Sequence, residues 1–207
     1  MSGVFITFEG PDGAGKTTQL QRLSRHLRQL GLSHICTREP GGTPTAERIR
    51  TLLFDPDAQL VPDAELLLFA AARAQHVQEC IVPALEQGQW VLCDRFTLST
   101  LVYQGYGRGL NHDCIHQLSA MATGGLHPHL QLVVDVDVLH GQQRIHQRHG
   151  DANNRFDTLS REFHQRVVEG FRAVAGSEVN CLLVDGRRSE DEVHRSIVSA
   201  LRQRGLL

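Results

Sequence analysis

Near its start the chain reads Gly10-Pro11-Asp12-Gly13-Ala14-Gly15-Lys16-Thr17-Thr18. The stretch matches the pattern G-x-x-x-x-G-K-[ST] at every fixed position, with apolar residues 4–8 before it and a helix-like segment, 18–30, after it. Small residues let successive backbone N–H groups surround an anion, and the positive N-terminus of the following helix faces the same point. The stretch therefore predicts a triphosphate site, with Lys16 on the outer phosphates and Thr17 as a Mg²⁺ ligand.

Lys16 is the only lysine among the 21 Lys and Arg residues of the chain. A compact ammonium group with three donors fits inside a cradle of backbone groups, whereas the planar guanidinium of arginine does not. A preference for arginine codons explains the scarcity of lysine elsewhere, but it does not explain this one exception. The exception itself therefore indicates a phosphate cradle.

The composition favours one compact domain, residues 1–207, because 207 residues with 41% hydrophobic content suit a single core. The formal charge is −2 and arginines never occur more than two in a row, so a nucleic-acid-binding surface has no electrostatic support. No apolar run approaches the roughly 18 residues that a membrane span needs. We expect neither nucleic acid nor membrane as a partner.

The cysteines are odd in number, widely spaced and mostly within apolar runs: Cys36, Cys80, Cys93, Cys114 and Cys181. Structural disulfides use cysteines two at a time and form in oxidising compartments. This usage predicts buried thiols in a reducing compartment, so we expect a cytoplasmic protein.

Strand-like and helix-like segments alternate along the chain. Strands are expected at 4–9, 33–37, 90–94, 130–135 and 181–185, and helices at 18–30, 45–53, 63–87, 98–104, 113–123, 140–149, 161–175 and 190–204. Short, continuously apolar strands are typical of a parallel sheet, which predicts an α/β, three-layer P-loop sandwich with five parallel strands and helices on both faces. Ligands on such sheets bind beyond the carboxyl ends of the strands. The polar stretch 150–154 between two helices is a candidate lid.

The strand expected at 90–94 ends in Asp94, a carboxylate of the kind that holds Mg²⁺ directly or through water in P-loop proteins. Other carboxylates also end apolar runs, namely Asp135, Asp137 and Asp185. Arg95 favours Asp94 as the metal ligand, because an arginine beside the metal carboxylate suits a site that gathers phosphate charge.

Phe69 and Arg73 are four residues apart in the helix expected at 63–87, so they share one of its faces. A nucleoside monophosphate would suit this pair, with its base against the ring and its phosphate on the guanidinium. Helix spacing alone favours the plainer interpretation, a core phenylalanine and a surface arginine paired with a carboxylate.

Four motifs together resemble those of the thymidylate kinases of bacterial type, members of the P-loop nucleoside monophosphate kinase superfamily. They are Phe8-Glu9-Gly10-x-Asp12-Gly13-x-Gly15-Lys16-Thr17-Thr18, Thr37-Arg38-Glu39-Pro40-Gly41-Gly42-Thr43, Phe69-x-x-x-Arg73 and Asp94-Arg95-x-x-x-Ser99-Thr100-x-x-Tyr103-Gln104-Gly105. The Arg-Glu-Pro-Gly-Gly and Ser-Thr-x-x-Tyr-Gln segments separate this family from adenylate, guanylate and shikimate kinases. The resemblance implies an ATP:dTMP phosphotransferase that forms dTDP for dTTP biosynthesis.

The resemblance also implies a substrate-binding set. Its members would be Asp12, Glu39, Pro40, Phe69, Arg73, Arg95, Ser99, Thr100, Tyr103 and Gln104. Phe69 would stack on thymine, Arg73 and Arg95 would bind the dTMP phosphate, and Asp12 would take the 3′-hydroxyl. Thr100 and Gln104 would contact the base edge and Tyr103 would crowd the sugar 2′ position, while Glu39 and Pro40 receive no single role.

The reaction implied is in-line transfer of the γ-phosphoryl group from ATP to dTMP. The residues of 10–18 would bind ATP, Thr17 and Asp94 would hold Mg²⁺, and the catalytic residues would be Lys16, Arg95, Arg148 and Asp12. Their positive charges and the loop N–H groups would compensate the charge of two phosphates brought together. The family resemblance further implies a homodimer.

Position 13 is Gly where the eukaryotic type of this family carries Arg, so the resemblance implies that a catalytic arginine comes from the lid, about residues 144–157. We expect Arg148 to reach the transferring phosphoryl group with Arg144 in support, and Arg155 is the alternative. His146 would be a poor substitute, because an imidazole with a pKa of about 6.5 is mostly neutral at assay pH.

Two other classes of protein share parts of this pattern. A GTPase that reads guanine through Asn-Lys-x-Asp is excluded because Lys16 is the only lysine, while a regulatory ATPase stays as an alternative. A deoxynucleoside kinase would run the same chemistry on an uncharged acceptor, and the pair Arg73 and Arg95 favours a phosphorylated one. His112 and His116 have helical metal-site spacing but lack the glutamate of such sites, so we expect them to be structural.

Overall fold

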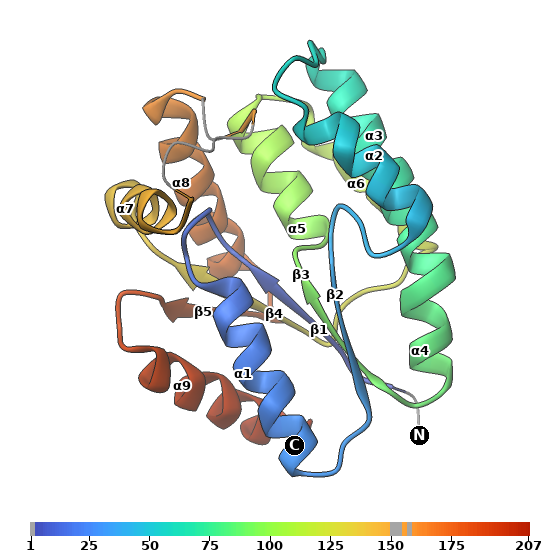
Figure 1. Ribbon diagram of the computed structural model, residues 1–207, viewed down its shortest axis with the longest axis vertical. Helices are drawn as coiled ribbons and strands as arrows, with labels where there is room; N and C mark the ends of the chain where they lie inside the picture. Colours follow the sequence, from blue (N-terminus) through green and yellow to red (C-terminus); the bar gives the residue numbers. More distant parts are fainter. Residues whose placement is uncertain (1–2, 150–154, 157–158) are drawn as a thin grey trace.

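The computed structural model describes residues 3–149, 155–156 and 159–207, with only the backbone described at 147–149. Within these residues one sheet of five parallel strands has the order β2-β3-β1-β4-β5. The strands are β1 Phe5–Glu9, β2 His34–Arg38, β3 Trp90–Asp94, β4 Leu130–Asp135 and β5 Cys181–Asp185. Helices lie on both sides of this sheet, which confirms the predicted parallel α/β sandwich (Figure 1).

The helical elements follow the predicted alternation but not every predicted bound. They are α1 Lys16–Gln29, α2 Pro44–Phe54, α3 Pro62–His76, η1 Val77–Ile81, α4 Val82–Glu86, α5 Thr97–Thr100, η2 Leu101–Gly107, α6 His112–Thr123, α7 Val138–His149, α8 Arg161–Ser177 and α9 Glu190–Gln203. The expected helix 63–87 contains a π-helical stretch, η1, and the expected helix 98–104 is replaced in its second half by another, η2, which continues to Gly107. Apolar periodicity does not reveal such wider turns, which often occur at functional sites.

One face of the sheet is covered by α1 and α9, which lie side by side below it in Figure 1. The buried residues Leu20, Leu23 and Leu27 recur at the helical spacing of α1 and pack on β1 and its neighbours. The opposite face carries a second apolar layer, in which the rings of Phe5 and Phe96 meet edge to face at 4.9 Å. The sheet is thus buried on both faces, as its continuous apolar strands predict.

The register of the strands brings the chemically interesting segments to one edge. Phe8 of β1 lies beside Asp94 of β3, and Arg38 of β2 lies on the other side of the same residue. The P-loop leaves β1 at Gly10, where φ is 130° and a Cβ would lie 2.3 Å from the carbonyl oxygen of Val134. Only glycine fits there, so the loop turns at once toward α1.

The burial of the thiols only partly follows the prediction. Cys93 and Cys181 are buried, but Cys36 and Cys114 are exposed and Cys80 is half-buried. Cys36 lies on β2, one of the two edge strands of the sheet, and its side chain is exposed there. Among the described residues no helix is both long and apolar enough to cross a membrane.

Candidate active site

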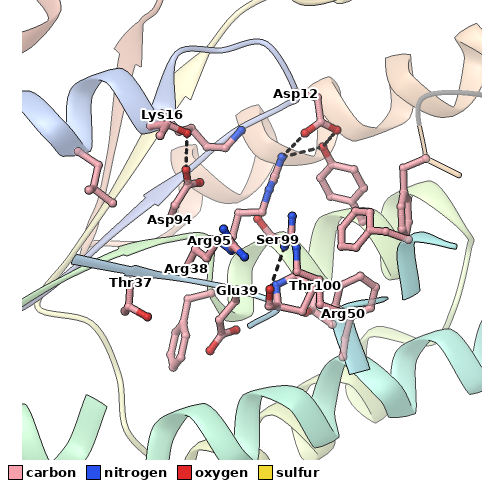
Figure 2. A pocket seen from close by; sticks show the side chains of 18 of the residues that line it. Asp12, Lys16, Thr37, Arg38, Glu39, Arg50, Asp94, Arg95, Ser99 and Thr100 are labelled. Carbon is pink, nitrogen blue, oxygen red and sulfur yellow. Dashed lines mark hydrogen bonds and ion pairs between the residues drawn. The ribbon is translucent and has the colours of Figure 1, made fainter. Parts of the chain in front are cut away.

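A cavity of about 600 Å³ lies beyond the carboxyl ends of β1, β2 and β3 (Figure 2). It is lined by all the residues of the predicted substrate-binding set and by both predicted metal ligands, Thr17 and Asp94. Of the P-loop stretch, its lining includes Asp12, Gly13, Gly15, Lys16 and Thr17, but not Gly10, Pro11, Ala14 or Thr18. The tertiary fold therefore joins four motifs that are far apart in the chain.

Lys16 lies at the first position of α1 and is nearly buried, with 7% of its surface exposed. Its Nζ donates to the backbone oxygens of Gly10 (3.1 Å) and Pro11 (2.8 Å). Burial lowers the pKa of Lys16 to about 8, and the nearby Arg95 charge acts in the same direction. The ammonium group is thus held by neutral carbonyl groups that a phosphate oxygen can replace.

Thr17 and Asp94 meet in front of α1, where the Thr17 hydroxyl donates to Asp94 Oδ2 over 2.7 Å. Hydroxyl and carboxylate oxygens are the hard ligands that Mg²⁺ prefers, and Mg²⁺ keeps most of its remaining positions for water and phosphate. Both side chains line the cavity beside the P-loop. The donor set at this point fits a magnesium ion.

Arg95 has the only positive φ, 73°, among the described non-glycine residues, which is an unusual conformation for a side chain of this size. The backbone turn directs its guanidinium into the cavity, where Nη1 donates to Gly10 O (3.1 Å) and Ser99 Oγ (3.0 Å). Nη2 forms an ion pair with Asp12 and a longer contact to the Tyr103 hydroxyl. The strained turn therefore fixes a cation between the P-loop and η2.

Asp12 accepts from two partners, Arg95 on Oδ1 and the Tyr103 hydroxyl on Oδ2 (2.7 Å). Burial opposes ionisation of this carboxyl, but the charges of Arg95 and Lys16 outweigh it and lower its pKa to about 2. Burial in turn raises the pKa of Tyr103, which stays a neutral donor. Asp12 is consequently a carboxylate with a fixed orientation on the wall of the cavity.

Glu9 is a functional candidate that the sequence analysis missed. It is fully buried at the end of β1 and accepts from Ser99 Oγ over 2.6 Å, and Ser99 in turn accepts from Arg95. Burial raises the pKa of Glu9 to about 7. Its signal in the sequence was a carboxylate at the last position of an apolar strand, directly before the P-loop.

Arg73 is buried rather than on the surface, so the plainer sequence interpretation is wrong. Its Nε donates to Glu39 Oε2 over 2.7 Å, and its Nη2 donates to Phe96 O (3.0 Å) and Thr100 Oγ1 (2.9 Å). Its Nη1 is buried and has no hydrogen-bond partner in the part of the chain that the structure describes. Buried donors are normally paired, so this nitrogen indicates a site for a ligand oxygen.

The remaining wall of the cavity is aromatic and polar. Phe69 of α3 lies 6.1 Å from the ring of Phe156. Gln104 donates through Nε2 to buried Glu65 over 2.9 Å, which leaves its carbonyl oxygen as an acceptor. Arg50 of α2, which the sequence analysis did not select, lines the same cavity and donates to Pro40 O over 2.8 Å.

The lid arginines differ in what they contact. Arg144 of α7 lies near Gly13 O (3.5 Å) and donates to Gly186 O (3.0 Å), so it spans the P-loop and the segment after β5. Arg155 pairs with Glu65 (2.8 Å) and donates to Leu53 O (3.2 Å). His146 is exposed. The side chain of Arg148 and the candidate lid turn 150–154 lie outside the described residues.

Comparison with known proteins agrees with this geometry. The family model described as thymidylate kinase matches residues 8–197. The chain is 47% identical to a thymidylate kinase of Deinococcus radiodurans and 46% identical to one of Geobacter sulfurreducens, with 98% of each chain covered in both cases. The crystal structure of thymidylate kinase from Ehrlichia chaffeensis is 34% identical with a TM-score of 0.80, and the match covers 97% of this chain and 100% of that one. Fold, cavity and sequence together show that the chain belongs to the thymidylate kinase family.

Proposed function

We infer that the protein transfers the γ-phosphoryl group of ATP to dTMP and releases dTDP. One observation carries this assignment: Arg73, whose Nη1 has no partner among the described residues, and Arg95 line the same cavity as the P-loop lysine. Two guanidinium groups suit an acceptor that already bears a phosphate, because each can bind phosphate oxygens in a fork. A single site for donor and acceptor also favours direct, in-line transfer.

On the acceptor side, we assign the dTMP phosphate to Arg73 and Arg95 and the base to Phe69. The Gln104 carbonyl oxygen would accept from N3–H of thymine, since its amide nitrogen already donates to Glu65. The Thr100 hydroxyl would lie at the base edge, and Ser99 would support Arg95.

The sugar would lie between Asp12 and Tyr103. Asp12 would accept from the 3′-hydroxyl through a lone pair that Arg95 and Tyr103 leave unused. The Tyr103 ring, held by its hydrogen bond to Asp12, would crowd a 2′-hydroxyl. Glu39 and Pro40 would shape the pocket through the loop that follows β2.

On the donor side, the backbone of residues 10–18 would receive the ATP phosphates, with Lys16 moving its donors from two carbonyl groups to the outer phosphates. Thr17 and Asp94 would hold Mg²⁺, which supplies charge neutralisation on the phosphates when bound. Lys16 and Arg95 would stabilise the charge of the transferring group from opposite sides, and Arg148 would complete this set from the lid. Asp12 keeps Arg95 in place during the transfer.

A deoxynucleoside kinase and a regulatory ATPase are the competing functions. The test supplies the purified protein with Mg·ATP and either dTMP, thymidine or no acceptor, and follows ADP and nucleotide products. We expect dTDP from dTMP, no dTMP from thymidine and negligible ADP without acceptor. Turnover of thymidine, or equal ADP release without acceptor, would reject the proposal.

We further propose a single kinase domain over residues 1–207, with the lid at about 144–157, that works as a homodimer in the cytoplasm. Exposed apolar residues support the dimer: Leu67 on α3 and Met121 on α6 are 54% and 75% exposed, and these two helices pack against each other. Exposed apolar side chains on two neighbouring helices favour association. Sedimentation of the purified protein should give the mass of a dimer.

A further inference from the structure

Four side chains beside the cavity form a continuous series of hydrogen bonds, which we call the buried chain. Its members are Thr37 near the end of β2, His76 at the end of α3, Glu39 in the loop after β2, and Arg73 one turn before His76. His76 Nε2 lies 2.7 Å from Thr37 Oγ1, and His76 Nδ1 lies 3.0 Å from Glu39 Oε1. Glu39 Oε2 accepts from Arg73 Nε over 2.7 Å. The series thus runs from the edge strand to a cation of the cavity.

Glu39 is the centre of the buried chain, because each of its oxygens has a different cationic or imidazole partner. The side chains of Glu39 and Arg73 are 3% exposed and that of His76 is fully buried, so water does not compete for these contacts. A buried carboxylate needs such partners to remain charged. His76 therefore occupies the half of the carboxylate that Arg73 does not reach.

The protonation of His76 Nδ1 follows from its partner. A carboxylate only accepts hydrogen bonds, so Nδ1 must carry a hydrogen. Nε2 faces the hydroxyl of Thr37, which can either donate or accept. His76 therefore keeps its hold on Glu39 both as a neutral imidazole and as an imidazolium.

Because Arg73 is hydrogen-bonded to Glu39, the position of Glu39 fixes the orientation of the Arg73 guanidinium. Its guanidinium is a rigid plane, and three acceptors already fix its Nε and Nη2 atoms: Glu39, Phe96 O and Thr100 Oγ1. Fixing these two nitrogen atoms also fixes Nη1, the donor without a partner among the described residues. A displaced Glu39 would release Nε and tilt this free donor.

The loop itself leaves no room for the imidazole to move. Gly42 has a φ of +86°, and a Cβ there would lie 2.5 Å from Cδ2 and Nε2 of His76 and 2.6 Å from Thr37 Oγ1. The Gly42 backbone is thus packed directly against the ring. A shift of the loop after β2, of Thr37 or of His76 would therefore displace the other two.

We propose that His76 is a positioning residue for phosphoryl transfer, which holds Glu39 so that Arg73 presents its free Nη1 to the phosphate of the acceptor. His76 does not line the cavity, so it acts through Glu39 rather than on the substrate. The inference rests on the proposed function, because it assigns the acceptor phosphate to Arg73. The spacing Phe69, Arg73, His76 places all three on one helix face, so the sequence already held this signal.

The charged and titratable groups that face His76 are Glu39 from the loop and Cys80 from η1, with Arg73 beyond Glu39. Burial lowers the pKa of His76, but the hydrogen bonds that His76 donates to Cys80 and Glu39 outweigh burial and raise the pKa to about 9. The Cys80 thiol has a pKa lowered by His76 in return. At neutral pH the imidazole is consequently charged and adds to the attraction for Glu39.

Two isosteric variants separate the roles of the two ring nitrogens. The amide nitrogen of asparagine can take the place of Nδ1 and that of glutamine the place of Nε2, so His76→Asn keeps the donor to Glu39 and His76→Gln loses it. For each we would measure kcat, KM for dTMP, KM for ATP and the thermal unfolding midpoint. His76→Gln should lower kcat/KM for dTMP roughly 10-fold to 100-fold, as expected of a misplaced binding group. Its KM for ATP should stay within about twofold of wild type, and His76→Asn should keep at least about a third of wild-type kcat/KM for dTMP.

The inference is overturned if folded His76→Gln binds and phosphorylates dTMP like the wild type. It is also overturned if His76→Asn and His76→Gln lose dTMP and ATP kinetics to the same extent, because that pattern indicates a general structural role. Should His76→Gln not fold, Thr37→Val removes only the outer hydroxyl and should raise KM for dTMP about threefold with KM for ATP unchanged. An unchanged KM for dTMP in that variant contradicts the proposal.

The two proposals fail in different ways. If the wild-type protein used thymidine in place of dTMP, the proposed function would fail whatever the variants do. If the wild type phosphorylated dTMP and His76→Gln did so equally well, only the role of His76 would fall.

Discussion

The cations on the two sides of the cavity are held by different kinds of partner. On the P-loop side, Lys16 donates to the carbonyl oxygens of Gly10 and Pro11 and Arg144 to that of Gly186, all of them neutral groups. On the other side, Arg73 pairs with Glu39, whereas Arg95 lies between the two sides, where it pairs with Asp12 of the P-loop and also donates to Gly10 O. The positive charge of Lys16 is thus held by neutral carbonyl groups, whereas that of Arg73 is held by a carboxylate.

This difference indicates two ways of preparing a phosphate site. A carbonyl group can be exchanged for a phosphate oxygen without leaving a buried charge behind, so Lys16 can follow the nucleotide as it binds. A carboxylate partner stays in place and fixes the geometry of its arginine before the substrate arrives, which reduces the ordering needed on binding. The P-loop side is built for exchange of partners, whereas the Arg73 side is preorganised.

The largest loss of activity is expected on changing Lys16, because only a small cation can exchange the two carbonyl oxygens for phosphate oxygens. Lys16→Arg keeps the charge, but its planar fork does not fit between the two carbonyl groups. We expect Lys16→Arg and Lys16→Met both to lower kcat about 10³-fold or more, as for other groups that stabilise phosphoryl transfer. Single-turnover formation of dTDP measures this effect.

The control for Lys16 is Arg25→Lys, on the exposed side of the same helix, which should keep the wild-type rate. A Lys16→Arg enzyme with more than about a tenth of wild-type kcat would show that charge alone suffices and that the cradle does not select for shape.

The lid arginines give the next largest effect and extend the comparison to α7. We expect Arg148→Ala to lower kcat about 100-fold or more with little change in Kd for ATP, as for arginines that act on the transition state. Arg144→Ala should chiefly weaken ATP binding, because Arg144 bridges Gly13 O of the P-loop and Gly186 O of the segment after β5.

His146→Ala and Arg155→Ala complete the lid series in the same single-turnover assay. His146 is exposed, so its loss should change the rate by no more than about threefold. Arg155 pairs with Glu65, and its loss should lower the unfolding midpoint more than the rate. The assignment of Arg148 is wrong if His146→Ala is the most damaged variant or if Arg148→Ala keeps more than about a tenth of the rate.

On the preorganised side, Phe69→Ala should raise KM for dTMP and leave KM for ATP unchanged. A base stacked on an aromatic ring contributes about 1–3 kcal/mol, so we expect an increase of roughly 5-fold to 150-fold. Steady-state kinetics with each substrate varied in turn measure it, and Gln78→Ala, exposed in η1, is the matched control. Equal increases in both KM values would remove Phe69 from base recognition.

The smallest effect is a pH dependence of stability that reports on the buried chain. The pKa of His76 is raised from 6.5 to about 9, so the native state binds the proton more tightly than the unfolded state. The stabilisation is therefore complete below pH 6.5 and is lost as the pH rises through about 9. Asn does not titrate, so the unfolding midpoint of the wild type should fall relative to His76→Asn over this window, by a few degrees.

The wild type and His76→Asn share every other titrating group, including Glu9, whose raised pKa also lowers stability as the pH rises. Subtracting the two curves removes Glu9 and leaves the contribution of His76 together with that of Cys80, whose pKa depends on His76. Parallel curves from pH 6 to 9 would show that His76 is not charged in the native protein.

The sequence predictions depend on neighbours in the chain. The P-loop, the Asp94–Arg95 pair at the end of β3 and the Phe69–Arg73 helix face are local patterns of spacing and residue type, and their roles stay predictions. The alternation of apolar strands with helices led in the same way to a parallel sheet, and the structure confirms it. Local patterns also gave wrong predictions. The apolar periodicity predicts ordinary α-helix at two places where the backbone forms the π-helices η1 and η2.

What the sequence by itself determined is therefore the kind of chemistry: phosphoryl transfer by a P-loop protein with a single lysine, on a sheet whose strand ends carry polar residues. The tertiary structure decided which buried charges meet. Glu39 finds Arg73 and His76 at separations of 34 and 37 residues, and Glu65 finds Arg108 at 43. These pairs depend on strand order and on how the end of α3 packs beside β2. The spacing of residues along the chain does not show which partners another element will bring to them. For that reason Glu39 had no role in the sequence and a central one in the fold.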